Sequence, residues 1–305
     1  MSIEIRAWAE ADRGALRALV SDASLAEHFD QFQGERGFDS KLHDPRLFRA
    51  GLRLATCDGE PAGFGLAWWL PQDEGVWVMT RVGVVGRFRR RGIGTRLARA
   101  LVAAADASGA RPDVSGSAWY PDPAGEALAA RLGFAHERWF WLMTRPRGGA
   151  PEPVWPADIE LRTFDGSDRA IADWIAAYED SFADHFRHVR STAEDGRRMA
   201  SDPGFRADGL ALAYRGAECV GFCRNALFER RGEIGVLGVV RAARGIGLGR
   251  ALLRWGVRWL EANGPGPVTL LVDGANESAL ALYRSEGFEV TRTRRIWGRP
   301  REASA

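Results

Sequence analysis

The chain has 305 residues, of which 46% are hydrophobic and 27% are charged, with a net charge of +2. This length suits two cores of about 150 residues each, and no apolar run reaches the roughly 18 residues of a membrane span. The mixed charges carry no footprint for nucleic acid, and the first residues lack the layout of a signal peptide. We therefore expect a cytoplasmic globular protein with no membrane or nucleic-acid partner.

The three cysteines of the chain are Cys57, Cys219 and Cys223. They are too few for a disulfide framework, and no Cys or His cluster has the spacing of a zinc site. We expect no metal.

The first half of the chain alternates between strands and helices. Ile3–Trp8 is extended, a helix is expected from about Asp12, and two strands paired around a turn follow within residues 51–69. The segment RFRRRGIGTRLARAL, residues 87–101, then places glycines ahead of an amphipathic helix. A short helix from Asp122 completes this half.

The second half repeats this order after a linker rich in proline and glycine. Ile159–Phe164 is extended, paired strands lie within residues 209–228, and RAARGIGLGRALL, residues 241–253, is the second glycine loop. A strand at Val268–Asp273 and a short helix from Asn276 follow. The repetition predicts a duplicated mixed α/β domain with the boundaries 1–145, linker 146–157, and 158–305.

Each glycine loop connects a strand to a helix. Such a loop gathers unpaired amides at the positive end of the helix dipole, which suits a phosphate or pyrophosphate. A glycine loop can also serve only as a tight turn with close packing, but the occurrence of two copies in one context favours anion binding. Neither copy has the Lys-Ser/Thr pair of a Walker loop or the third glycine of a Rossmann loop.

The segments VVRAARGIGLGRALL, residues 239–253, and NESALALYRSEGF, residues 276–288, resemble the two motifs of the GCN5-related N-acetyltransferase (GNAT) family. The resemblance covers the whole chain as two copies, as in the mycothiol synthase-like branch of that family. It implies an α/β fold with a mixed sheet, built as two tandem GNAT-type acyl-CoA N-acyltransferase domains. It also implies acetyl-CoA, or another acyl-CoA, as co-substrate.

The same resemblance assigns the residues that bind the co-substrate. In the second half, the pyrophosphate would contact the backbone of Arg244, Gly245, Ile246, Gly247, Leu248, Gly249 and Arg250. The pantetheine arm would pair with Leu237, Gly238 and Val239, and Asn276 would also contact the co-substrate. The first-half counterparts are Val82, Val84, Arg89, Arg90, Arg91, Gly92, Ile93, Gly94 and Thr95.

Two residues of the second half are candidates for proton transfer. Tyr283 occupies the position of the family's tyrosine, and a phenol can donate to a departing thiolate; its alternative is a core tyrosine. Glu233 lies in the apolar strand that leads into the loop, so it either faces solvent or serves as a base or substrate contact. A constant offset of 155 residues pairs Glu233 with Val78, and the later motif pairs Tyr283 with Ala129.

We therefore expect the second domain to transfer an acyl group directly to a primary amine of a small molecule, and the first domain to be non-catalytic. The alternatives are a non-catalytic acyl-CoA sensor or scaffold, and a protein N-acetyltransferase. His185 and His188 are weak candidates for the acceptor pocket, because surface histidines at this spacing are commonly just solvated. We expect a monomer whose two domains pack as a pseudo-dimer.

Overall fold

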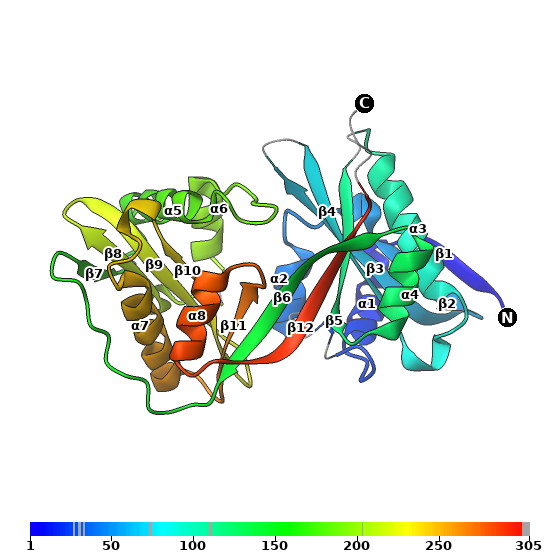
Figure 1. The fold of residues 1–305 in the computed structure, drawn as a ribbon. Coiled ribbons are helices and arrows are strands. Elements are labelled where there is room, and N and C mark those ends of the chain that lie inside the picture. The colour runs from blue at the N-terminus through cyan, green and yellow to red at the C-terminus, as the bar shows by residue number, and fades with distance from the viewer. Residues whose placement is uncertain are drawn as a thin grey trace. The chain divides into compact units, whose positions relative to one another are not determined.

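A computed structural model describes residues 1–26, 28–29, 32, 34–72, 75–109, 112–202 and 204–300. The chain divides into two compact units, drawn in Figure 1. Unit 1 consists of Met1–Trp139 and Arg294–Ala305, and unit 2 consists of Phe140–Thr293. The linker at 146–157 separates the two repeats along the chain, whereas each compact unit includes a segment from the end of the other repeat.

Two long strands account for this exchange. They are β6 (Ala135–Arg145) and β12 (Glu289–Gly298), and each contributes residues to both units. Residues Phe140–Arg145 of β6 pair antiparallel with β11 (Val268–Asp273) inside unit 2. Arg299, which follows β12, donates its backbone N–H to the carbonyl oxygen of Val114 in unit 1, at 2.9 Å.

The repeat in unit 1 follows the predicted order of elements. Its strands are β1 (Ile3–Ala7), β2 (Arg53–Cys57), β3 (Glu60–Pro71), β4 (Val76–Val84) and β5 (Asp113–Tyr120), in that spatial order. Its helices are α1 (Arg13–Val20), α2 (Gly34–Leu42), α3 (Ile93–Asp106) and α4 (Pro123–Arg131), with 3-10 turns at Glu10–Asp12, Arg49–Gly51 and Gly86–Phe88. The pairings from β1 to β4 are antiparallel, and β4 with β5 is parallel, which makes the sheet mixed.

Unit 2 repeats the arrangement. Its strands are β7 (Glu160–Thr163), β8 (Leu210–Arg215), β9 (Glu218–Leu227), β10 (Gly232–Val239) and β11, in the order β7-β8-β9-β10-β11-β6. Its helices are α5 (Asp168–Phe182), α6 (Ala193–Ala200), α7 (Leu248–Asn263) and α8 (Glu277–Ser285), with 3-10 turns at Ala207–Gly209 and Arg241–Ala243. Again only β10 with β11 is parallel within the repeat.

Helices α5 and α7 cover opposite faces of β9 and β10 in unit 2 (Figure 1). On the α7 side, the helix approaches closely at Gly256, where an added Cβ would lie 2.7 Å from the Cys223 sulfur and 2.8 Å from Ile234. On the α5 side, the Phe222 ring lies 6.2 Å from the ring of Tyr178. Because successive side chains of a strand point to opposite faces of the sheet, the side chains of β10 alternate between the α5 side and the α7 side.

Among the described residues, no helix is both long enough and apolar enough to cross a bilayer.

Candidate active site

The loop between β10 and α7 leaves its backbone amides available to a ligand. Gly245 and Gly247 have φ angles of 81° and 90°, and the turn that they form begins the 16-residue helix α7. Within the described part of the chain, the amides from Gly245 to Gly249 donate no hydrogen bond. Unpaired amides at the positive end of a helix dipole are a site for an anion such as a pyrophosphate.

At Gly249, neither the backbone conformation nor packing within the protein explains why the residue is a glycine. Its φ is outside the left-handed region, and an added Cβ would meet nothing nearer than 3.7 Å. Gly94, its counterpart in unit 1, is likewise 3.7 Å from its nearest neighbour. Because neither backbone strain nor crowding inside the protein requires glycine there, the missing side chain leaves room for a ligand outside the helix.

The loop of unit 1 has the same backbone pattern. Arg90 and Gly92 have φ angles of 64° and 81°, at the positions of Gly245 and Gly247. The left-handed conformation costs a residue other than glycine about 1–2 kcal/mol, yet unit 1 adopts it at Arg90. The amides from Arg90 to Gly94 also donate no hydrogen bond within the described residues. Unit 1 therefore retains the anion-binding shape of the loop.

Arg244 and Arg89 fasten their loops through side-chain hydrogen bonds to backbone carbonyls. Arg244 donates to the carbonyl oxygen of Val239 at 3.2 Å and to that of Ser181 at 3.0 Å. Arg89 makes the corresponding bonds to Val84 at 3.0 Å and to Ser24 at 2.8 Å. The two guanidinium groups thus hold the loop in place, and the loop amides remain for the ligand.

The parallel strands separate next to each loop. In unit 2, β10 pairs with β11 only from Gly232 to Ile234, so Leu237, Gly238 and Val239 have no partner in β11. In unit 1 the pairing of β4 with β5 ends at Thr80, ahead of Val82 and Val84. An open strand edge can accept an added extended chain with amide groups, which is what the pantetheine arm of an acyl-CoA presents.

A β-bulge distinguishes β10 from β4. The register of β10 against β9 shifts between Ile234 and Val236, so Gly235 is an extra residue. β4 runs against β3 in one register from Val76 to Val84. The constant offset of 155 residues therefore fails before the bulge, and the unit 1 counterpart of Glu233 is Met79, which pairs with β5 where Glu233 pairs with β11. The match of Glu233 with Val78 is wrong, but unit 1 still has no acid at this position.

Glu233 lies on the α5 side of β10, opposite Ala226 of β9. Its side chain is 26% exposed and accepts a hydrogen bond from Arg231 at 3.3 Å. The carboxylate is thus paired with a cation at the edge of the site, and it is partly open to solvent. It keeps both of its predicted roles, base and substrate contact.

Tyr283 lies on α8, and its ring packs against the core beside Phe288, at 6.1 Å between ring centres. Burial, and to a lesser extent the neighbouring Cys223, raises the pKa of the Tyr283 phenol to about 12. Among the described residues the hydroxyl has no hydrogen-bond partner. The phenol is therefore protonated at neutral pH and has a proton to donate to a ligand. Its unit 1 counterpart, Ala129, has no such group.

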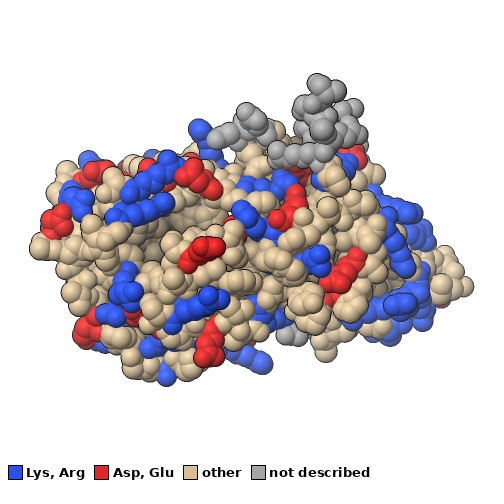
Figure 2. Space-filling model, viewed as in Figure 1, with Lys and Arg blue, Asp and Glu red and all other residues tan. Residues whose placement is uncertain are grey.

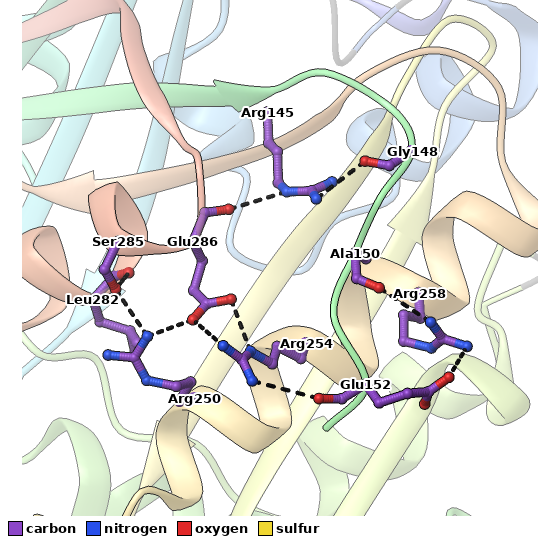
Figure 3. A network of polar contacts seen from close by, with 10 residues as sticks. All are labelled: Arg145, Gly148, Ala150, Glu152, Arg250, Arg254, Arg258, Leu282, Ser285 and Glu286. Atoms are coloured by element: carbon purple, nitrogen blue, oxygen red, sulfur yellow. Dashed lines mark hydrogen bonds and ion pairs between the residues drawn. The ribbon is translucent and has the colours of Figure 1, made fainter. Parts of the chain in front are cut away.

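The side chains of Arg250 and Asn276 have partners inside the protein. Arg250 donates to the buried carboxylate of Glu286 and to the Ser285 hydroxyl, as Figure 3 shows. The Asn276 side chain accepts from the backbone N–H of Ala279 at 3.1 Å and caps α8. Both side chains thus hold the helices around the loop, while the predicted contacts of these residues with the co-substrate remain untested.

The two histidines lie beyond the end of α5 rather than on a surface helix. The His188 Nε2 atom lies 3.2 Å from a carboxylate oxygen of Glu179, and only 13% of the His188 side chain is exposed. The centre of the His185 ring lies 5.1 Å from that of the Phe182 ring, and the two rings are tilted by 49°. Neither is simply solvated, and both belong to the segment next to the α5 face.

Other parts of the molecule do not join this site. A cavity of about 480 Å³ lies between β7, β8 and the start of α5, and no predicted site residue lines it. Within the described residues, no group of three His, Cys, Asp or Glu side chains is placed to hold a metal ion. Basic and acidic side chains are interspersed over the face drawn in Figure 2.

Sequence reasoning missed Arg224, an arginine with a buried Nε atom on the α5 side of β9, near Glu233. The signal was present in GFCRNALF, residues 221–228, where an arginine interrupts an apolar strand. A charge in such a strand is costly unless it has a partner or a task.

A family model for the acetyltransferase (GNAT) family matches residues 8–134 and 171–288. The chain belongs to this family. It is 34% identical over 291 residues to a mycothiol acetyltransferase of Salinispora arenicola, covering 91% of this chain and 89% of that protein. It is 39% identical over 218 residues to a mycothiol acetyltransferase of Frankia alni, and that match spans 66% of this chain and 64% of the relative.

Solved structures show the same tandem arrangement. A GCN5-related N-acetyltransferase from Sphaerobacter thermophilus superposes with a TM-score of 0.74 at 25% identity, covering 97% of this chain and 95% of that one. A tandem GNAT protein from the clavulanic acid biosynthesis pathway has a TM-score of 0.73 at 18% identity, covering 97% and 98%, and is similar in fold. The family, the tandem mixed α/β fold and the acetyltransferase class predicted from the two motifs are confirmed.

Proposed function

We propose that unit 2 catalyses direct transfer of an acetyl group from acetyl-CoA to a primary amine of a small molecule. The observation that carries the proposal is the combination, in unit 2 alone, of an open amide loop and a separated strand with Glu233 and Tyr283. The names of the relatives, mycothiol acetyltransferases, support a small-molecule acceptor.

The loop and the strand edge would hold acetyl-CoA, which supplies an activated thioester. The amides from Gly245 to Gly249 would bind the pyrophosphate, and Leu237 to Val239 would pair with the pantetheine arm. A backbone N–H near Val239 would then stabilise the oxyanion that forms when the amine attacks the thioester carbon.

Two side chains would transfer the protons of the reaction. Glu233 would accept a proton from the attacking amine, directly or through one water molecule. As the carbon–sulfur bond breaks, Tyr283 would donate its O–H to the leaving sulfur, which ends as the thiol of CoA. The amine loses one proton and the thiolate gains one, so the products are an amide and free CoA.

For unit 1 we propose acyl-CoA binding without turnover. Its loop and separated strands retain the binding shape, but Met79 stands where unit 2 has the proposed base, Glu233, and Ala129 stands where unit 2 has the proposed acid, Tyr283. The monomeric state, the pseudo-dimer and the cytoplasmic location stay predictions.

Mass spectrometry of the purified protein with acetyl-CoA and a library of small amines and peptides tests this proposal. We expect small amines to gain an acetyl group as free CoA accumulates. Bound acetyl-CoA without any acetylated product would favour the sensor instead, and products confined to peptides would favour a protein N-acetyltransferase. Both outcomes would contradict the proposal.

A further inference from the structure

Arg224 lies on β9, beside the candidate site, and its Nε atom is buried. In β9 it pairs with Val236, the first residue of β10 after the bulge at Gly235. Directly opposed residues share a face of the sheet, so Arg224 lies on the α5 side together with Glu233. An added Cβ at Gly235 would lie 3.3 Å from one terminal nitrogen of the guanidinium, which therefore extends across the bulge.

The guanidinium of Arg224 lacks the partners that a buried cation needs. Its Nε atom is buried without a hydrogen bond, and no nitrogen of the side chain donates one to any described residue. Burial lowers the pKa of Arg224, opposed by the nearby Glu233 carboxylate and, more weakly, by Tyr178. An arginine stays charged at neutral pH, so the site holds a positive charge with unused donors.

The nearby carboxylate of Glu233 makes no hydrogen bond with Arg224. Glu233 accepts its hydrogen bond from Arg231 instead, at 3.3 Å. A buried charge without hydrogen-bonded partners destabilises a fold, and the cost is often repaid at a functional site by a ligand. Five N–H donors in a planar fork match a carboxylate. One terminal nitrogen of this fork lies beside Gly235, the first residue of β10 after its pairing with β11 ends.

We propose that Arg224 binds an anionic group of the acceptor, so that the preferred substrates of unit 2 are amines that also carry a carboxylate. This inference rests on the proposed function of the same site. Neighbouring strands lie about 4.8 Å apart, so a carboxylate on Arg224 would lie within about one strand spacing of the bulge and of the open part of β10 that would hold the acyl-CoA. That separation suits α- and β-amino acids and their close derivatives.

Unit 1 offers an internal comparison. Leu66 pairs with Arg81 of β4 as Arg224 pairs with Val236 of β10, so it occupies the corresponding place, and it is 1% exposed. The apolar residue removes the anion site in the unit that also lacks Glu233 and Tyr283. The three differences thus separate the same two units, as expected if the three side chains act on one substrate.

The test uses the full chain, acetyl-CoA, and matched acceptor pairs: free α-amino acids and the same compounds as carboxamides, which keep the amine and lose the negative charge. For the wild type we expect a kcat/KM that is about 10- to 100-fold higher for the carboxylate member of the preferred pair, from one or two charge-assisted hydrogen bonds. Arg224→Gln should abolish this preference by lowering kcat/KM for the carboxylates while the carboxamides and the Kd of acetyl-CoA stay unchanged.

Arg197→Gln is the matched control, because Arg197 is an exposed arginine of α6 paired with Asp168, and it should change nothing. The melting temperature of Arg224→Gln should equal or exceed that of the wild type, because the substitution removes an unpaired buried charge. A lower melting temperature with an unaltered acceptor preference would make Arg224 structural and overturn the inference.

Equal acetylation of carboxylates and carboxamides by the wild type would overturn the role of Arg224 alone. If no amine of either kind is acetylated although acetyl-CoA binds, the proposed function fails, and this inference fails with it.

Discussion

The loops of units 1 and 2 have the same backbone shape, but the strands that precede them differ. Both loops place two residues at positive φ ahead of a helix, and both are fastened by an arginine bonded to two backbone carbonyls. The strand before the loop differs, because β10 has an extra residue at Gly235 and β4 does not. Bulges re-aim side chains beside active sites, and in this protein the bulged strand is the one that carries Glu233.

The comparison separates the requirements of binding from those of chemistry. Binding an acyl-CoA uses backbone amides and an open strand edge, which tolerate most side-chain substitutions. Under the proposed function, proton transfer and acceptor recognition would use the side chains of Glu233, Tyr283 and Arg224 in unit 2, where unit 1 has Met79, Ala129 and Leu66. If the proposal holds, unit 1 has lost these side chains while the backbone shape of its loop persists.

The largest expected effect comes from cutting the chain between the repeats. A fragment of residues 158–305 lacks Phe140–Arg145, which pair with β11, and it lacks the bond from Arg145 to Glu261 at 2.6 Å. Small domains have only about 5–15 kcal/mol of stability, so we expect this fragment to lack a cooperative thermal transition in circular dichroism. A fragment of residues 140–293, which contains all of unit 2, should retain one. Cooperative unfolding of both fragments would show that the β6 segment is dispensable.

The next effect is on catalysis. Tyr283→Phe keeps the ring and its packing but removes the proton donor, so we expect acetyl transfer to fall by roughly 10- to 10,000-fold with little change in the Kd of acetyl-CoA. Steady-state rates and calorimetric titration measure the two quantities. Tyr120→Phe in unit 1, where the side chain is exposed, is the control and should leave both unchanged. An active Tyr283→Phe variant would assign the phenol to the core.

A smaller effect concerns the acid stability of unit 2. Burial opposes ionisation of Glu286, but hydrogen bonds from Arg254 and Arg250 outweigh it, so the pKa of Glu286 is lowered. Its contribution is therefore complete above the unfolded pKa of about 4.3 and is lost as the pH falls through the lower folded value. Glu286→Gln should cost about 2 kcal/mol at neutral pH and progressively less in acid, as measured by denaturant unfolding at several pH values.

Glu152→Gln is the control for this measurement. Glu152 belongs to the same network in Figure 3 and pairs with Arg258, but its side chain is 74% exposed. Exposed ion pairs contribute little, so the variant should unfold like the wild type at each pH. A loss of stability in Glu286→Gln that does not depend on pH would mean that shape, and not charge, sets the role of Glu286.

The smallest effect tests the strain in the loop of unit 1. Arg90→Gly relieves a left-handed arginine, so it should stabilise unit 1 by up to about 1 kcal/mol, after the greater freedom of glycine in the unfolded chain is subtracted. Arg91→Gly, at the next residue and outside the left-handed region, should instead destabilise it. Thermal melts of the two variants should shift in opposite directions. A destabilised Arg90→Gly variant would mean that the side chain of Arg90 has a structural role.

Short-range patterns in the sequence predicted the loops, the order of elements and the positions of Glu233 and Tyr283. The exchange of β6 and β12 was not predictable, because it depends on which distant strand each long strand pairs with. The bulge at Gly235 was also hidden, since a repeat aligned at constant offset does not reveal an inserted residue, and this placed Glu233 against Val78 instead of Met79. Arg224 was overlooked because only the folded chain shows that it has no partner.

The most direct test of the division between the units is a pair of matched loop variants, Gly247→Glu and Gly92→Glu. Both glycines have a positive φ and open space at the Cβ position, so each substitution imposes similar strain and places one negative charge at an anion site. With the rate of acetyl transfer as the readout, and folding checked by circular dichroism, we expect Gly247→Glu to abolish turnover and Gly92→Glu to leave it nearly intact. A folded Gly92→Glu variant without activity, beside an active Gly247→Glu variant, would place the chemistry in unit 1 and contradict the account.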